Sequence, residues 1–271
     1  MCPSIRKYST QAFIEAAESN LVEKCLSFAR QPCGEVHGPN PVWFVTGSHV
    51  AGYNGIARAC LPAADVDAAI ADALRPFHQR GLPLTWWTGP SSQPGSLGAR
   101  LQAAGFRHNR DMIGMCAEMD QLISTGEDMP AVEIEPVTTR EGLAEWLPIY
   151  AQGFGTPPTI ARESLEILAL LAFDLQAGWK HFCARQNGQI IAISSLFIND
   201  GIGGLYNLVT LPEARGQGIG AAVTLRTFAA ARDMGCQIAT LQTTYPNALR
   251  LYHRLGLEVY CKFGIYQFIR P

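Results

Sequence analysis

A glycine-rich segment between an apolar stretch and an amphipathic stretch constrains this chain more than any other feature. It reads Val209-Thr-Leu-Pro-Glu-Ala-Arg-Gly-Gln-Gly-Ile-Gly220. The apolar residues before it predict a strand that stops at Pro212, and the residues after it predict a long helix. Glycines let backbone N–H groups approach a ligand closely, the helix adds the positive end of its dipole, and Arg215 adds a charge. This arrangement predicts a site for phosphate or pyrophosphate.

Several known loops share this glycine spacing, and a tight turn without a ligand shares it too. A P-loop needs Lys-Ser/Thr after its last glycine, where this sequence has Ala221-Ala222. A dinucleotide-binding loop matches by its glycines but also needs an acidic residue about 20 positions later. No Asp or Glu lies between Asp233 and Glu258. The sequence therefore disfavours both of these loops.

The segment resembles the acetyl-CoA loop of the GNAT acyltransferase superfamily, whose pattern is Arg/Gln-x-x-Gly-x-Gly/Ala. The matching residues here are Arg215, Gly216, Gln217, Gly218, Ile219 and Gly220. In that family the pantetheine arm of acetyl-CoA lies along the exposed backbone of the strand before the loop. The resemblance implies that acetyl-CoA is the cosubstrate and that three strand residues bind its arm, namely Leu208, Val209 and Thr210. A backbone N–H there would polarise the thioester carbonyl.

A tyrosine in the last predicted helix matches a second motif of the family, Ala-x-x-x-Tyr-x-x-x-Gly-Phe. Here the stretch runs from Ala248 through Tyr252 to Gly256-Leu257. The resemblance implies that Tyr252 is the catalytic acid that protonates the departing thiolate, whereas the simpler interpretation is a helix tyrosine packed in the core. Relatives often carry Asn seven residues before this tyrosine. Tyr245 occupies that position, and the role of Asn247 stays open.

The sequence does not identify a general base. Relatives often place a Glu on the strand before the loop, but residues 201–211 contain no carboxylate. A water chain could take this role, and His181 on an earlier predicted strand is a weaker candidate, since such a histidine is commonly structural. Glu163 and Glu166 on a predicted helix could face a cationic amine, although two Glu three residues apart usually mark a solvated face.

The predicted elements of the second half follow the order of the GNAT fold. Periodicity and turn residues give β-α-α-β-β-β-α-β-α-β between Val132 and Phe268, including a hairpin over Asn187-Gly188. The resemblance implies an α/β (α+β) fold, in which a mixed, mostly antiparallel sheet is flanked by helices. We expect two tandem copies of it.

The first half repeats part of this order in a degenerate form. Leu61-Pro62 precedes a predicted helix as Leu211-Pro212 does, but Asp65-Val66-Asp67-Ala68 stands in place of the glycine loop. These carboxylates would repel a pyrophosphate. We therefore expect a degenerate GNAT-like domain over residues 1–125 and a catalytic GNAT domain over residues 126–271, although chance similarity between two α/β domains is the alternative.

Composition excludes several classes of function for this chain of 271 residues. A net charge of −2 argues against nucleic acid. No apolar run approaches the roughly 18 residues of a membrane span, and the N-terminus lacks a signal peptide, so we expect a cytoplasmic protein. Eight cysteines lack a Cys-x-x-Cys pair and six histidines lack metal-ligand spacing, so we expect no metal.

These observations together predict an acetyl-CoA-dependent N-acetyltransferase that works by direct transfer. The acceptor is expected to be a small-molecule amine or a peptide N-terminus, and the protein is expected to be a monomer or homodimer. The alternative function is a non-catalytic acyl-CoA sensor or scaffold, which the missing strand carboxylate favours and Tyr252 disfavours.

Overall fold

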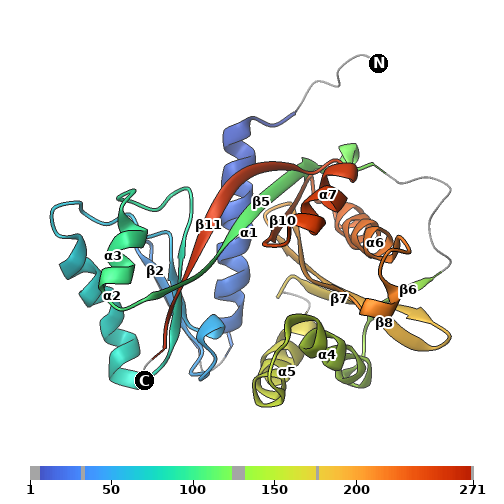
Figure 1. Ribbon diagram of the computed structural model, residues 1–271, viewed down its shortest axis with the longest axis horizontal. Coiled ribbons are helices and arrows are strands. Elements are labelled where there is room, and N and C mark those ends of the chain that lie inside the picture. Colours follow the sequence, from blue (N-terminus) through green and yellow to red (C-terminus); the bar gives the residue numbers. More distant parts are fainter. Residues whose placement is uncertain (1–6, 32–33, 124–131, 175–176, 270–271) are drawn as a thin grey trace. The chain divides into compact units, whose positions relative to one another are not determined.

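The computed structural model describes residues 7–31, 34–123, 132–174 and 177–269 (Figure 1). The chain divides into two compact units, and each unit draws on two separate parts of the sequence. Unit 1 contains Met1–Asn20 and Met115–Tyr260, and unit 2 contains Leu21–Gly114 and Cys261–Pro271. The expected domain boundary between residues 125 and 126 lies outside the described residues.

Unit 1 is a mixed sheet with helices on both faces (Figure 1). Its strands are hydrogen-bonded in the order β6-β7-β8-β9-β10-β5, with antiparallel pairs from β6 to β9 and a parallel pair between β9 and β10. The elements are β6 (Glu133–Val137), α4 (Arg140–Phe154), α5 (Pro158–Ala172), β7 (Trp179–Gln186), β8 (Gln189–Asn199), β9 (Ile202–Thr210), α6 (Ile219–Asp233), β10 (Ile238–Thr243) and α7 (Pro246–Arg254). The start of α1 (Thr10–Ala29) and the end of β5 (Arg107–Glu118) complete it. This architecture confirms the predicted fold class and element order.

Local sequence explains how several of these elements begin and end. The β7–β8 hairpin turns at Asn187 and Gly188, whose φ angles of 52° and 78° suit Asn-Gly in a tight turn. Thr139 caps α4 by accepting a hydrogen bond from the Gly142 amide at 3.1 Å. Gly155, with a φ of 61°, ends the same helix in the left-handed conformation.

Neighbouring serines of β8 show which helices cover which face of the unit 1 sheet. The Ser194 hydroxyl contacts Thr227 of α6 at 2.7 Å. Ser195 points to the other face, where its hydroxyl contacts His181 of β7 and the ring of Trp146 of α4 lies 5.2 Å from the His181 ring. Successive strand residues point to opposite faces, so α4 and α6 lie on opposite faces of the sheet.

Unit 2 is a second sheet with its own core. Its strands follow the order β1-β2-β3-β4-β11-β5. Its elements are β1 (Glu35–His37), β2 (Val42–Val45), β3 (Gly55–Ala57), α2 (Val66–Arg80), β4 (Leu84–Thr88) and α3 (Leu97–Ala103), with the end of α1, the start of β5 and most of β11 (Glu258–Phe268). Trp86 is fully buried in the core of this unit, and Trp87 is nearly so.

The last strands of the two sequence halves each complete the unit formed mainly by the other half. The end of β5, from Met115, lies beside β10 in unit 1. The greater part of β11, from Cys261, belongs to unit 2, where Gly264 pairs with Thr88 and Phe268 pairs with Leu84 of β4. Each compact unit therefore depends on residues from both sides of the expected boundary.

Candidate functional site

The strands β9 and β10 separate before either of them ends. Their parallel pairing runs from Ile202 with Ile238 to Leu205 with Leu241. β9 continues to Thr210, paired with β8 but with no described partner on the β10 side. The backbone groups of Leu208, Val209 and Thr210 that face this opening are consequently available to a ligand. The Thr210 carbonyl is the exception, because it accepts a hydrogen bond of 3.0 Å from the Arg215 Nε.

A bulge in β9 lies where the two strands separate. Ile193 pairs with Val209, and Ser195 pairs with Tyr206. Between these two pairs β9 contains one more residue than β8, which is a β-bulge. Asn207 lies in the bulge with a φ of 53°, a left-handed conformation that asparagine adopts more readily than most residues. The sequence contained no pattern that predicted this bulge.

The predicted glycine loop leads directly from β9 into α6. A short turn at Pro212–Ala214 precedes it, and Arg215 through Gly218 are exposed. Gly216 and Gly218 have φ angles of 76° and 78°, which residues with a Cβ rarely adopt. Among the described residues, the amides of positions 216–218 donate to no backbone carbonyl. Together with the unpaired amides at the start of α6, they form a helix N-terminus with the free N–H groups that an anion could accept from.

Ile219 and Gln217 of the predicted loop hold it in place. Ile219, the first residue of α6, is only 1% exposed and packs in a cluster that includes Ala192 and Val223. The Gln217 side chain donates to the Glu213 carbonyl at 3.1 Å. The side chains of these two residues therefore stabilise the loop and leave the backbone N–H groups of residues 216–218 unpaired within the described part of the chain.

The loop, the end of β9 and α7 meet at Gly220. A Cβ built on Gly220 would lie 3.5 Å from Thr210 Oγ1 and 3.7 Å from Leu251 Cδ2. Leu251 precedes Tyr252 in α7, so the fold brings both sequence motifs to one place. Tyr252 is 6% exposed, and this burial raises the pKa of its phenol above the ordinary value. Within the described part of the chain, its hydroxyl has no hydrogen-bond partner.

The two residues considered for the usual Asn position lie at the start of α7. Tyr245 is the N-cap residue and is 57% exposed. Asn247 is also exposed, and its Oδ1 accepts a hydrogen bond of 3.0 Å from Arg250 on the same helix. Neither arrangement assigns a catalytic role to these side chains.

The candidates for a base differ in their surroundings. Glu166 of α5 is exposed and Glu163 is half-buried. His181 is almost fully buried, and this burial lowers the pKa of its imidazole to about 4, so the ring is neutral at pH 7. A buried imidazole with so low a pKa is a weak base, which disfavours His181 as the proton acceptor.

Unit 2 contains an equivalent opening that its own backbone closes. β3 and β4 pair only at Gly55 with Thr85 and Ile56 with Trp86. Beyond this point, Gln93 donates its amide to the Ala59 carbonyl and accepts from the Leu61 amide, both at 2.9 Å. The backbone groups that correspond to the free edge of β9 are therefore occupied. No glycine loop precedes α2, and Asp65 is its N-cap residue.

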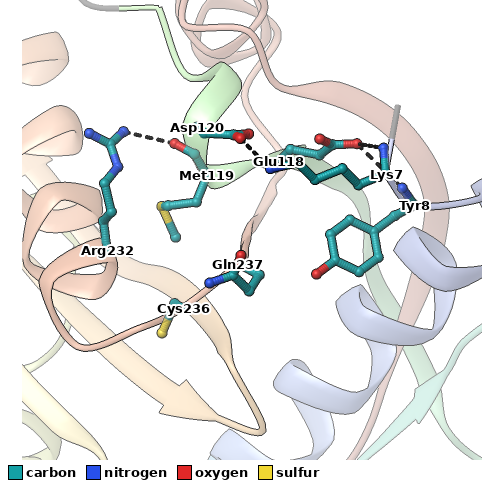
Figure 2. Close-up of a pocket in the computed structure, with 8 residues that line it drawn as sticks. All are labelled: Lys7, Tyr8, Glu118, Met119, Asp120, Arg232, Cys236 and Gln237. Atoms are coloured by element: carbon teal, nitrogen blue, oxygen red, sulfur yellow. Dashed lines mark hydrogen bonds and ion pairs between the residues drawn. The ribbon is translucent and has the colours of Figure 1, made fainter. Parts of the chain in front are cut away.

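A pocket of about 90 Å³ lies at the far end of α6 from the loop (Figure 2). α6 has 15 residues, so its ends are about 22 Å apart at 1.5 Å per residue. Figure 2 shows that the charged side chains of this pocket are engaged: Lys7 forms an ion pair with Asp120 at 2.5 Å, Glu118 accepts from the Lys7 amide at 2.5 Å, and Arg232 donates to the Met119 carbonyl at 2.7 Å. These contacts attach the residues before α1 to the end of β5, and they do not belong to the opening at β9.

Two further findings concern membrane-spanning helices and metal-binding groups of side chains in the described part of the chain. Among the described residues, no helix is long and apolar enough to cross a membrane. No group of three or more His, Cys, Asp or Glu in that part of the chain has the geometry to hold a metal ion.

Comparison with known proteins gives a family match for part of the chain and a similar fold for nearly all of it. Residues 144–257 match the model of the acetyltransferase (GNAT) family. The structure is similar to a GCN5-related N-acetyltransferase from Kribbella flavida, with a TM-score of 0.71, 19% identity, and coverage of 94% of this chain and 96% of that one. A second such protein, from Sphaerobacter thermophilus, has a TM-score of 0.62, 17% identity, and coverage of 100% and 98%.

A tandem GNAT protein from the clavulanic acid biosynthesis pathway also aligns along most of both chains. Its TM-score is 0.59 at 12% identity, with coverage of 96% of this chain and 94% of that chain. No curated protein sequence matches significantly. At these identities the structural similarities establish the fold, and the family match at residues 144–257 supports acyl transfer as the general chemistry. Residues 144–257 therefore match the acetyltransferase (GNAT) family, and the chain as a whole shares the fold of GCN5-related N-acetyltransferases.

Proposed function

We propose that this chain transfers the acetyl group of acetyl-CoA directly to an amine, at unit 1. The observation that carries the proposal is the opening between β9 and β10 directly before an anion-binding helix N-terminus. The opening offers unpaired backbone groups to a pantetheine arm, and the helix N-terminus offers unpaired amides to a pyrophosphate. Both features are continuous in the chain, so one extended ligand can use both.

The residues present fit the chemical parts of acetyl-CoA. The amides from Gly216 onward would hold the phosphates, and the Arg215 guanidinium lies beside them with one nitrogen bonded to Thr210. The backbone of Leu208, Val209 and Thr210 would hold the arm. These assignments rest on unpaired backbone groups and on the left-handed conformations of Gly216 and Gly218. Side chains therefore contribute little to the proposed binding of acetyl-CoA.

The transfer itself requires few groups from the protein. The amine nitrogen attacks the carbonyl carbon of the thioester, the carbon–sulfur bond breaks, and the amine gives its proton to water. A backbone N–H of β9 stabilises the charge on the carbonyl oxygen. The Tyr252 hydroxyl donates a proton to the departing thiolate. The raised pKa of this phenol keeps it protonated across the neutral range, and the proton is then replaced from solvent.

We further propose one cosubstrate site per chain. In unit 2, Gln93 takes the backbone positions that the arm would need, and Asp65 precedes a helix without a glycine loop. The function of unit 2 is therefore structural.

A calorimetric titration and a thiol-release assay test the proposal together. Acetyl-CoA should bind with a stoichiometry near one per chain, and free thiol should appear only when an amine is added. A panel of small amines and peptides with free N-termini would identify the class of acceptor. Two equivalent binding sites would contradict the assignment of unit 2. Tight binding without thiol release from any amine would favour the acyl-CoA sensor or scaffold instead.

A further inference from the structure

A chain of hydrogen bonds connects the β9 bulge to a buried histidine. Asn207 Nδ2 donates to Ser195 Oγ at 3.0 Å, and Ser195 Oγ lies 2.7 Å from His181 Nδ1. The three residues come from adjacent strands, β9, β8 and β7. The mechanism above uses none of their side chains.

The donors and acceptors determine which way the protons point along this chain of hydrogen bonds. Ser195 Oγ accepts from Asn207, so its own proton requires an acceptor. His181 Nδ1 is the partner that the described residues provide. The imidazole then carries its proton on Nε2, which is buried and has no partner in the described part of the chain. A core position selected for packing alone would favour a side chain without this unsatisfied atom.

We propose that His181 is a positioning residue, which through Ser195 orients the Asn207 side chain and so holds the β9 bulge in the shape that receives the pantetheine arm. This inference rests on the proposed function. The bulge lies at the point where β9 leaves β10, so its shape decides where the backbone of Leu208 to Thr210 points. Acyl transfer needs that backbone aligned with the thioester.

The surroundings of the histidine keep the chain of hydrogen bonds in place. The His181 ring stacks on Trp179 with centroids 5.8 Å apart, and Trp146 of α4 meets it edge-on. On the other side of the bulge, α4 packs directly on β9 at Val209. The contact is so close that a Cβ on Gly153 of α4 would overlap the Val209 side chain. The bulge is thus held from β8 by hydrogen bonds and from α4 by packing.

Two ligands separate a positioning role from a merely structural one. Acetyl-CoA uses both the glycine loop and the β9 edge, whereas adenosine 3′,5′-bisphosphate has the nucleotide end without the arm. Ser195→Ala should weaken acetyl-CoA binding about tenfold, the scale of one or two lost hydrogen bonds, and leave the nucleotide affinity unchanged. Ser194→Ala is the matched control. It removes a buried serine hydroxyl from the same strand, but that hydroxyl bonds Thr227 of α6 and not His181. It should lose similar thermal stability without losing affinity for either ligand.

Two substitutions of the histidine test its part. The carboxamide in His181→Asn can still reach Ser195 in place of Nδ1, so this variant should keep most of the acetyl-CoA affinity. His181→Leu should lose it as Ser195→Ala does. Equal affinity of His181→Leu and the unsubstituted protein, or equally severe loss in His181→Asn and His181→Leu, would overturn the inference. If the unsubstituted protein does not bind acetyl-CoA at all, the proposed function fails and the inference fails with it. Normal binding in all variants refutes the inference alone.

Discussion

Removal of the residues before Met129 should leave unit 1 unable to fold, because two of its parts lie in the first half of the chain. These parts are the start of α1, through Asn20, and the end of β5, from Met115. β5 lies beside β10 in the sheet, and the Thr240 hydroxyl donates to the Met115 carbonyl at 3.1 Å. The fragment Met129–Pro271 therefore exposes an edge of β10 that β5 covers in the intact chain.

The buried side chains that the fragment loses set the size of the effect. Phe13, Met115 and Met119 are each at most 2% exposed. Full burial of one such side chain contributes about 1.5–3 kcal/mol, so the three together contribute about 5–9 kcal/mol. Asn20 adds a polar loss, since its carboxamide bonds Asn199 at 2.5 Å and Tyr206 at 2.8 Å. A domain has only about 5–15 kcal/mol of total stability, so the fragment should be unfolded or aggregated.

Circular dichroism and thermal unfolding of the purified fragment measure this outcome. Coexpression of residues 1–125 with residues 126–271 is the control, because together they supply every part of unit 1 and should give a soluble pair. A monomeric fragment Met129–Pro271 that unfolds cooperatively and binds acetyl-CoA as tightly as the full chain would refute the reasoning.

Four other predictions concern single residues. Tyr252→Phe should lower kcat on the order of a hundredfold while the KM for acetyl-CoA stays within about twofold; unchanged kcat would make Tyr252 a packing residue. Gly218→Val should weaken acetyl-CoA binding in calorimetry, because its φ of 78° excludes a β-branched side chain and the branch would crowd the phosphates. Gly204→Ala should lower the free energy of unfolding by about 1–3 kcal/mol in urea, since its Cβ would overlap Asn20 Oδ1. Burial lowers the pKa of His181 from 6.5 to about 4 in the folded state. Between pH 6.5 and pH 4, His181 therefore takes up a proton in the unfolded state and not in the folded state. Stability should therefore fall by about 3 kcal/mol as the pH falls from 6.5 to 4, and His181→Asn should remove this slope in urea unfolding.

Local patterns in the sequence were sufficient to predict most elements of the fold. The turn at Asn187-Gly188 has the positive φ angles that its residue types favour. The sequence predicts helices that begin at Thr10 and at Ile219, and α1 and α6 begin at these residues. The sequence predicts turns from Pro32 to Pro41, because this stretch is rich in proline and glycine, but β1 (Glu35–His37) lies within it. It has three residues, all exposed, and is too short to show an alternating pattern.

The candidate site was predictable only in its residue types. The motif around Gly216 predicted a phosphate-binding loop, and the helix motif predicted Tyr252, but their proximity appears only where Gly220, Thr210 and Leu251 meet. The β9 bulge depends on the register between two strands, which no local pattern reports. The closure of the unit 2 opening depends on Gln93, an ordinary loop residue in the sequence.

The sequence by itself determined most of the helices and strands, the turn between β7 and β8, and the residue types of the loop before α6. These depend on residues within a few positions of one another, where periodicity and φ preferences act directly. The tertiary structure alone decided that the end of β5 completes unit 1 and that most of β11 completes unit 2. The local pattern of a strand does not name its partner, because strand pairing joins residues far apart in the chain and depends on the total burial and hydrogen bonding of the finished sheet.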